Sequence, residues 1–462
     1  MTGVQTCALP ISNKDINETL QLHENEIIIE LLEKRKSILF STEEITENFS
    51  IEEITEKKSI KSVESVAEKL LASSQEPTAI EILKQKKLIQ KISDMLGEIG
   101  IVGEENNRIL LFIIVVSYIT QAPLHAVIQG SSGSGKSFLI ARLAAIIPPE
   151  DLLQFTRITE SSLYNYGAFD LVRKVMIIED LDGLKDDALY ALRELISNLW
   201  VRSLTSIKDK KGNPKGTRKE VKGIFSSLCA TTKGEKYEDN MNRSFIVAVD
   251  ESVEQTQRII DYQNQKNAGE IDKKAQEKTQ NILMQLIRNL KDYEVVNPYA
   301  KRLTIPDNVR NKRRLNDMIQ SIIRQITIIN QYQRQQNAAG KLITEIEDLE
   351  NAVEILFESI ILKIDELDGS LRQFLEKLKT KFSDNKDFTR FEAMEITGFK
   401  KSQLQVYLNE LVRYEYLKQS GFMNKGFKYK IAHFDNMIKV RTELKKHFNS
   451  IIEQLKAEAS GS

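Results

Sequence analysis

The stretch Gly130-Ser131-Ser132-Gly133-Ser134-Gly135-Lys136-Ser137 decides the fold. It matches the phosphate-loop pattern G-x-x-x-x-G-K-S/T, and it lies between a β-like run, HAVIQ, and a helical run, SFLIARLAAI. Glycines let backbone N–H groups curl around phosphate oxygens, and the N-terminus of the following helix favours an anion. A Gly/Ser linker is the alternative interpretation, and the flanking strand and helix oppose it.

We therefore predict a nucleotide site in which Lys136 reaches the β- and γ-phosphates of ATP and Ser137 ligates Mg²⁺. The residues predicted to bind the nucleotide are Gly130, Ser131, Ser132, Gly133, Ser134, Gly135, Lys136, Ser137 and Phe138.

The composition limits which partners, membrane segments and metal sites the chain can have. Lys+Arg and Asp+Glu balance at 66 each, so any nucleic-acid surface must be a local patch. The longest apolar run, residues 109–116, is far shorter than the roughly 20 residues that span a bilayer and predicts a buried helix. Two cysteines and four scattered histidines cannot build a disulfide framework or a zinc cluster. We expect a cytoplasmic protein without a membrane partner.

Short β-rich runs alternate with helical segments around the loop, which predicts an α/β core with a parallel sheet covered by helices. A helical lid and a C-terminal winged helix are predicted to follow. The first residues, MTGVQTCALPIS, resemble a translated sequencing adapter. The predicted boundaries are 1–12 for this artefact, 13–85 for a helical linker or the tail of an upstream domain, 86–250 for the P-loop core, 251–365 for the lid, 366–435 for the winged helix, and 436–462 for a terminal helix and tail.

An acidic run follows one of the predicted buried strands. Val175 to Ile178 leads into Glu179-Asp180-Leu181-Asp182, as expected for a strand that delivers carboxylates beside Mg²⁺. We predict that Glu179 holds the metal and that Asp180 orients the attacking water. Such a pair is usually Asp then Glu, so the inverted order leaves the two roles open, and a surface acidic run is the alternative.

Two further polar residues are candidates for the hydrolytic reaction. The β-like run FSSLCATT ends in Thr231 and Thr232, and Thr232 is predicted to bond the γ-phosphate or the lytic water. Arg243 precedes the next β-like run, where it is predicted to serve as an arginine finger for a neighbouring subunit. A solvated arginine is the alternative.

Residues 208–222, KDKKGNPKGTRKEVK, carry seven basic and two acidic side chains around Gly-Asn-Pro. This pattern predicts a β-hairpin with a cationic tip. Lys210, Lys211, Lys215 and Arg218 are the candidates for DNA phosphate contacts, and a solvated loop is the alternative.

The sequence from Phe388 to Ile431 predicts the winged helix. Phe391, Met394 and Ile396 are expected to pack its first short helix. Its next helix is expected to enter a major groove, while the wing approaches phosphates. The candidate contacts are Lys400, Lys401 and Gln403 on that helix and Lys425 and Lys428 on the wing. A protein-interaction module is the alternative.

IEDLDGL at 178–184, the helix at 186–198, the basic insert, LCATT and NRSF at 242–245 follow one another in an order that resembles the AAA+ core of minichromosome-maintenance helicases. The resemblance implies a ring of subunits, a hairpin facing a central channel that holds single-stranded DNA, and a second sensor on the helix carrying Arg313-Arg314-Leu315. Arg313 is predicted to be that sensor.

Residues 90–380 resemble the C-terminal part of primase-helicase proteins of mobile elements in Bacteroidetes-like bacteria. The phrases that carry this likeness are GIVGEENNRILLF, IQGSSGSGKS, IIEDLDGL, ATTKGEKYEDNMNRS, VDESVEQTQRIIDYQN and ILKIDELDGSLRQF. It implies an ATP-driven DNA motor in replication or transfer of such an element, without the upstream primase modules. The alternatives are an ATP-switched DNA-binding regulator and the ATPase subunit of a transposition complex.

Overall fold

The computed structural model divides the chain into residues 1–76 and 77–462, and the description concerns the second unit. The residues that the structure describes are 78–159, 161–208, 214–232, 243–306, 309, 312–364, 367, 369–382, 386–399, 401–422, 426–432 and 437–460. The predictions for residues 1–77 and for Lys210, Lys211, Lys400 and Lys425 lie outside them.

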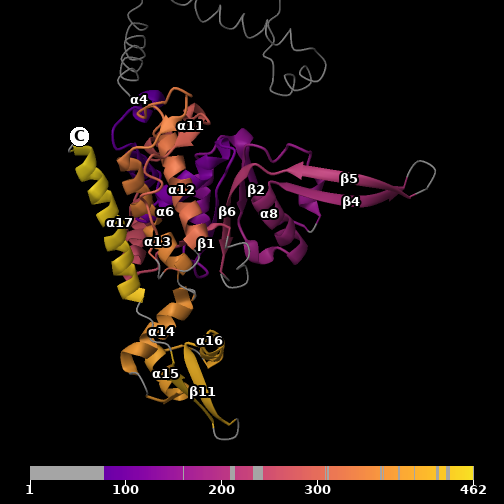
Figure 1. Ribbon diagram of the computed structural model, residues 1–462. Helices are drawn as coiled ribbons and strands as arrows, with labels where there is room; N and C mark the ends of the chain where they lie inside the picture. Colours follow the sequence, from indigo (N-terminus) through magenta and orange to yellow (C-terminus); the bar gives the residue numbers. More distant parts are fainter. Residues whose placement is uncertain are drawn as a thin grey trace, which may run out of the picture. The chain divides into compact units, whose positions relative to one another are not determined.

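A five-stranded parallel sheet forms the centre of the unit, in the order β2-β3-β6-β1-β7 (Figure 1). Its strands are almost continuously apolar, as expected when helices cover both faces of a parallel sheet. The predicted parallel sheet is therefore confirmed. The strands are β1 (His125–Gln129), β2 (Leu152–Phe155), β3 (Lys174–Ile178), β6 (Phe225–Thr231) and β7 (Phe245–Ala248).

The two faces of the sheet belong to two hydrophobic clusters because successive strand residues point to opposite faces. Ile177 and Leu228 face the cluster that contains α6 (Glu105–Val116) and α7 (Lys136–Ala144). Met176 and Cys229 face the cluster under α8 (Asp186–Asn198). The apolar run predicted to be a buried helix forms most of α6, and its residues are buried. Among the described helices, none is both long and apolar enough to cross a bilayer.

The predicted hairpin is present between α8 and β6. Strand β4 (Trp200–Lys208) pairs antiparallel with β5 (Pro214–Lys222), from the pair Trp200 and Lys222 to the pair Lys208 and Pro214. The hairpin is longer than the predicted 208–222 because its first strand begins at Trp200, directly after the αL residue Leu199 that ends α8.

The region after the sheet is largely helical, as predicted. Helices α12 and α13 pack in the same cluster as α6. A short parallel pair, β8 with β9, interrupts the helices. The elements of this region are α10 (Val253–Asn267), α11 (Lys273–Asn289), β8 (Val295–Val296), α12 (Lys312–Ile329), β9 (Leu342–Ile343) and α13 (Ile346–Ile364). Before the sheet lie α4 (Ala79–Leu83) and α5 (Leu88–Glu98), on which α11 packs.

Residues 367–431 form a small unit with its own core. Its helices are α14 (Gly369–Lys381), α15 (Arg390–Thr397) and α16 (Lys401–Arg413), and its strands are β10 (Phe388–Thr389), β11 (Leu417–Phe422) and β12 (Gly426–Ile431). The sheet order is β10-β12-β11 and its pairs are antiparallel. The predicted packing of Phe391 is wrong: α15 turns Ala393 and Thr397 inward, so that Phe391 is 68% exposed.

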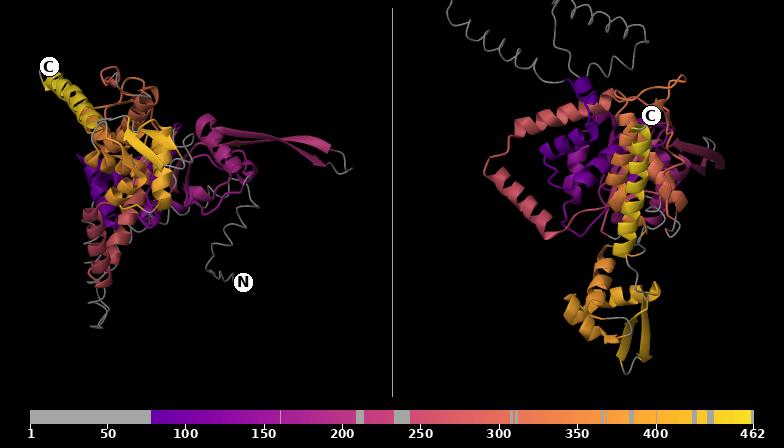
Figure 2. Two further views of the ribbon diagram at one scale, coloured as in Figure 1. Left: turned by 90° about the horizontal axis from the view of Figure 1, so that it is seen from below. Right: turned by 60° about the vertical axis from the view of Figure 1, so that its left-hand side comes forward.

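The C-terminal helix α17 (Met437–Ser460) returns to the helices that precede the small unit. It packs against α13, and Figure 2 shows it beside the helices that follow the central sheet. Leu444 and Phe448 belong to the cluster that contains α6, and Arg441 is paired with Glu358 of α13. The small unit is therefore inserted between two helices of the larger core.

We expect Phe448→Ala to lower the free energy of unfolding by about 3–5 kcal/mol, because it deletes a fully buried ring. Trp200, the only tryptophan of the chain, reports unfolding of the α/β core through its emission in urea. The matched control is Phe391→Ala, which removes an exposed ring and should shift stability by no more than about 0.5 kcal/mol. Equal effects of the two substitutions would contradict the packing of α17.

Candidate nucleotide-binding site

The glycine-rich loop connects β1 to α7, as the sequence predicts. Gly133 and Gly135 have φ angles of +85° and +98°, in the left-handed region that side chains with a Cβ rarely adopt. A Cβ built at either position would meet nothing within 4 Å, so there is open space beside both glycines. The loop thus has the backbone shape and the space that a chain of phosphates requires.

Lys136 is the first residue of α7, and its side chain folds back into the loop. Its Nζ donates to the carbonyl oxygens of Gly130 at 2.8 Å and Ser131 at 2.6 Å. Burial lowers the pKa of Lys136, while the charges of Glu251 and Asp182 act in the opposite direction. The ammonium group is therefore held inside the loop with two carboxylates close enough to stabilise its charge.

Glu251 is one of these carboxylates, and we did not predict it from the sequence. It follows β7, the strand beside β1, so its side chain reaches the start of the loop. Its two oxygens accept hydrogen bonds from the backbone N–H and the hydroxyl of Ser131, both at 2.6 Å. The only sequence signal was an acidic pair, Asp250-Glu251, directly after a β-like run.

Asp182 is the second carboxylate. Its Oδ1 accepts from the hydroxyl of Thr231 at 2.7 Å. Its Oδ2 accepts from the hydroxyl of Thr232 at 2.7 Å and from the backbone N–H of Thr232 at 3.0 Å. The ends of β3 and β6 are thereby tied together, and the predicted contact of Thr232 with the γ-phosphate or the lytic water stays a prediction.

The two carboxylates chosen from the sequence have other contacts. Glu179 accepts a hydrogen bond from the amide of Gln154 on β2, on the side of β3 away from β6 and β1. Asp180 is exposed, and its side chain caps the backbone N–H of Asp182. The metal role of Glu179 and the water-orienting role of Asp180 stay predictions, while the geometry favours Asp182 among the three acidic residues after β3, because its charge acts on Lys136.

The remaining predicted nucleotide residues lie along the loop and the start of α7. Ser131, Ser132, Ser137 and Phe138 are exposed, and Ser134 is half-buried. The guanidinium of Arg142 lies 4.9 Å from the ring centre of Phe138. Ser137 thus presents its hydroxyl at the helix N-terminus, where a metal bound to the phosphates would meet it.

A comparison with protein families matches residues 72–293 to a family described as the MTBMA_p00010 P-loop domain. This range includes the loop, the carboxylates after β3 and β7, and the hairpin. The match supports a nucleotide-binding P-loop NTPase domain. No curated protein matches the chain.

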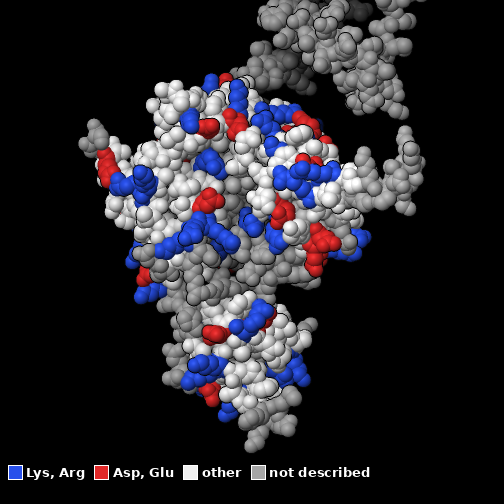
Figure 3. All heavy atoms as spheres, turned by 45° about the vertical axis from the view of Figure 1, so that its right-hand side comes forward, with Lys and Arg blue, Asp and Glu red and all other residues white. Residues whose placement is uncertain are grey.

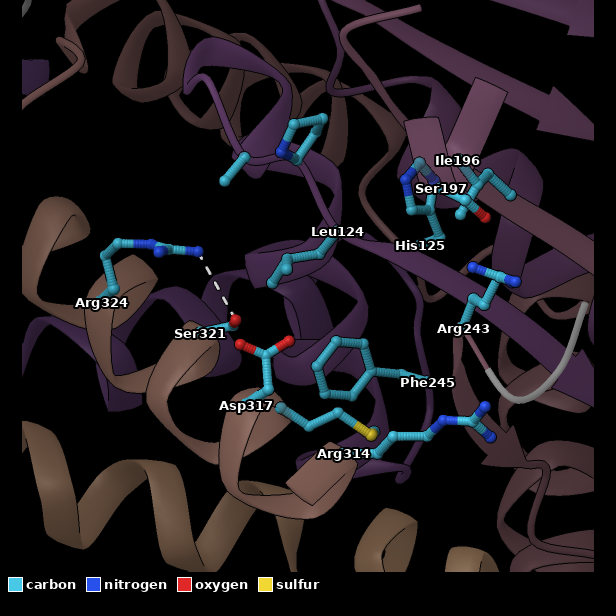
Figure 4. A pocket seen from close by; sticks show the side chains of 13 residues that line it. Leu124, His125, Ile196, Ser197, Arg243, Phe245, Arg314, Asp317, Ser321 and Arg324 are labelled. Atoms are coloured by element: carbon cyan, nitrogen blue, oxygen red, sulfur yellow. Dashed lines mark hydrogen bonds between the residues drawn. The ribbon is translucent and has the colours of Figure 1, made fainter. Parts of the chain in front are cut away.

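A second polar site lies at the opposite edge of the sheet, where β1 and β7 begin. A cavity of about 390 Å³ is lined there by the side chains of Arg243, Arg314 and Arg324 (Figure 4). Asp317 is the one carboxylate among its lining residues. Burial lowers the pKa of His125, in the same wall, to about 3, so its ring is neutral and the arginines supply the charge.

The structure separates the two arginines that the sequence offered as second sensor. Both arginines are exposed, but Arg314 lines the cavity and its neighbour Arg313 is not among the lining residues. Consecutive residues of a helix point about 100° apart, so only one of them can face the cavity. The assignment of Arg313 stays a prediction, and Arg314 is the residue that the geometry favours.

The candidate DNA residues that the structure describes lie on separate elements. Arg218 on β5 is exposed and is paired with Glu220, and Lys215 lies on the same strand. Lys401 and Gln403 are exposed at the start of α16, where Gln403 donates to the hydroxyl of Tyr407 at 3.1 Å. Lys428 is exposed on β12.

Asp182→Asn should lower the rate of ATP hydrolysis at least tenfold. The amide has one accepting oxygen instead of two, so it cannot accept hydrogen bonds from both threonines, and it no longer supplies a negative charge near Lys136. Phosphate release at saturating ATP measures this. Asp187→Asn, which changes an exposed carboxylate on α8, is the control and should leave the rate unchanged. If Glu179→Gln stops hydrolysis and Asp182→Asn does not, the assignment made from the sequence holds instead.

Lys363, on α13, provides a pH test of the charge of Arg314 in its surroundings. Burial, and then the charge of Arg314, lower its pKa from 10.5 to about 8. The unfolded chain then binds more protons than the folded one between these pH values, so stability from this group rises with pH in that window. Lys363→Met should be more stable than the wild type below pH 8, and the difference should shrink toward pH 10.5. Urea midpoints measure it; a constant difference would refute the buried charge.

Proposed function

We propose that this protein is an ATP-driven motor on DNA, the helicase part of a primase-helicase of a bacterial mobile element, acting in the cytoplasm. The observation that carries the proposal is the position of the β4–β5 hairpin along the chain, after β3 and α8 and before β6. Val201 and Val221, at its base, are buried with Met176 of β3 and Cys229 of β6. A basic hairpin thus shares a hydrophobic cluster with the two strands that lead to Asp182 and Thr232, and its strand β4 packs on α8.

The charge distribution supports DNA as the partner. The whole chain has no net charge, and Figure 3 shows basic side chains gathered in groups between acidic ones. Contacts between such groups and phosphates supply most of the affinity for DNA that does not depend on base sequence. The hairpin residues Lys210, Lys211, Lys215 and Arg218 are our candidates for contacts with a single strand in a channel.

Hydrolysis would be the transfer of the γ-phosphoryl group of ATP to water. Bound Mg²⁺ would neutralise charge on the phosphates, and Ser137 is the residue that would ligate it. Lys136 holds a positive charge inside the loop, and the backbone N–H groups of the loop would bind phosphate oxygens. Thr232, held by Asp182, would orient the attacking water.

The cationic cavity supports an assembly of several copies. Parallel strands begin at one edge of the sheet and end at the other, so Arg243 lies at the edge opposite the loop. A residue there is suited to a neighbouring subunit's nucleotide and not to its own. Arg243 as arginine finger and Arg314 beside it would complete that neighbour's site in a ring.

The unit 367–431 supports a second DNA contact. Three helices are followed by a two-stranded antiparallel hairpin, with β10 as a short third strand, which is the element order of a winged helix. The start of α16 presents Lys401 and Gln403, and the wing strand presents Lys428. We propose that this unit is a winged helix that binds duplex DNA.

An ATP-switched regulator that assembles on DNA without moving is the second candidate. The contacts of Glu179 favour it, because a carboxylate bonded to Gln154 on β2 is poorly placed to activate water at the loop. Slow hydrolysis would suit such a switch.

The decisive experiment measures ATP hydrolysis by the full chain with and without single-stranded and duplex DNA. We expect DNA to stimulate turnover, and Lys136→Ala to remove hydrolysis by a hundredfold or more, since the variant loses the charge that meets the phosphates. A variant with Lys210, Lys211, Lys215 and Arg218 changed to glutamine should keep its basal rate and lose only the stimulation. Slow hydrolysis that ignores DNA, together with ATP-dependent DNA binding, would replace the motor with the switch.

A further inference from the structure

One face of the β4–β5 hairpin contributes no residue to the nucleotide site described above. Alternate residues of β4 on this face are Trp200, Arg202 and Leu204, and their partners across the hairpin are Lys222, Glu220 and Arg218. The intervening residues Val201 and Val221 point to the other face and are buried. Leu204 is 79% exposed, so this face meets solvent.

An aromatic pair lies at the base of this face. The ring of Phe169 meets the ring of Trp200 edge to face, with ring centres 6.4 Å apart and an interplanar angle of 72°. Phe169 is 64% exposed although it is a large apolar side chain. The backbone N–H of Lys222 donates to the carbonyl of Ala168 at 2.8 Å, which holds the turn that carries Phe169 against the hairpin. The pair therefore has a fixed position.

Cationic groups surround the pair. Arg202 lies 5.4 Å and Lys222 lies 5.8 Å from the ring centre of Trp200. Glu220 is the one acidic residue among the six positions of this face, and it is paired with both Arg202 and Arg218. The face thus keeps a positive balance of charge beside two aromatic rings.

We propose that Phe169 and Trp200 form a stacking site for unpaired bases of single-stranded nucleic acid, with Arg202 and Lys222 beside its phosphates. Aromatic rings combined with cations are the means by which proteins bind single strands without regard to sequence. Bases in a duplex are stacked on one another, so their faces are not accessible to Phe169. This inference rests on the proposed action on DNA, and it specifies that the base of the hairpin binds the single-stranded form.

Trp200 makes the site directly observable, because it is the only tryptophan in the 462 residues. The full chain is titrated with oligothymidylate of about 16 nucleotides, with a duplex of equal length, and with an abasic strand of equal charge. Saturable quenching of Trp200 emission is expected with oligothymidylate alone. Equal quenching by the abasic strand would overturn the proposal, since it would show contact with phosphates only.

Substitutions at Phe169 complete the test. Phe169→Leu should weaken binding of oligothymidylate roughly tenfold, the loss expected for one stacked base, and Phe169→Tyr should restore it because the ring is kept. Phe391→Leu is the matched control, since it removes an exposed ring from the small C-terminal unit. Unchanged hydrolysis without DNA shows that each variant is folded.

Labelled DNA followed by anisotropy separates failure of this site from failure of the proposed function. If DNA binds and stimulates hydrolysis while Trp200 emission stays constant and Phe169→Leu binds like the wild type, the stacking site is wrong and the motor stands. If no nucleic acid binds or stimulates, both proposals fail. Quenching by an acidic peptide but not by oligothymidylate would assign the face to a protein partner and overturn the proposal.

Discussion

The buried ammonium group of Lys136 is the constraint on which the nucleotide site depends. A charge inside a protein must be stabilised by nearby polar groups, and two carbonyls and the carboxylates of Glu251 and Asp182 do this here. These carboxylates come from distant parts of the chain. They meet because β7, which precedes Glu251, lies beside β1, while β3, which precedes Asp182, lies on the other side of β1 with only β6 between them; these parallel strands all end at the same edge.

The same parallel arrangement gives the core two chemically different edges. At the carboxyl ends of the strands, acidic groups surround a single lysine in an open loop. At the amino ends, Arg243, Arg314 and Arg324 line a cavity with one carboxylate. A negatively charged ligand held in the loop of one copy therefore meets a positive surface if the opposite edge of another copy approaches it. The fold itself is suited to assembly around a shared anion.

Local sequence patterns predicted the individual helices and strands better than they predicted which of these elements lie side by side. The loop, the buried strands, the buried run in α6 and the basic hairpin follow from glycine positions and hydrophobic periodicity. Glu251 could not be found in this way, because its role depends on β7 lying beside β1, and strand order is set by long-range packing. The prediction for Phe391 was wrong, and the choice between Arg313 and Arg314 stayed open, for a related reason: the rotation of a helix about its axis decides which residue faces inward, and short amphipathic patterns fix it poorly.

Asp182 lies between the nucleotide-binding edge of the sheet and the hairpin in the sequence, with only α8 separating it from β4. It lies in the 3₁₀ turn Leu181–Gly183, and α8 begins at Asp186 and leads directly into β4. Its hydrogen bonds to Thr231 and Thr232 fix this turn to β6. A phosphate that drew either threonine or Lys136 toward itself would change the partners of Asp182. Because Leu181 of this turn, the inner face of α8 and the base of the hairpin share one hydrophobic cluster, the residues around Asp182 and the start of β4 are packed in one body.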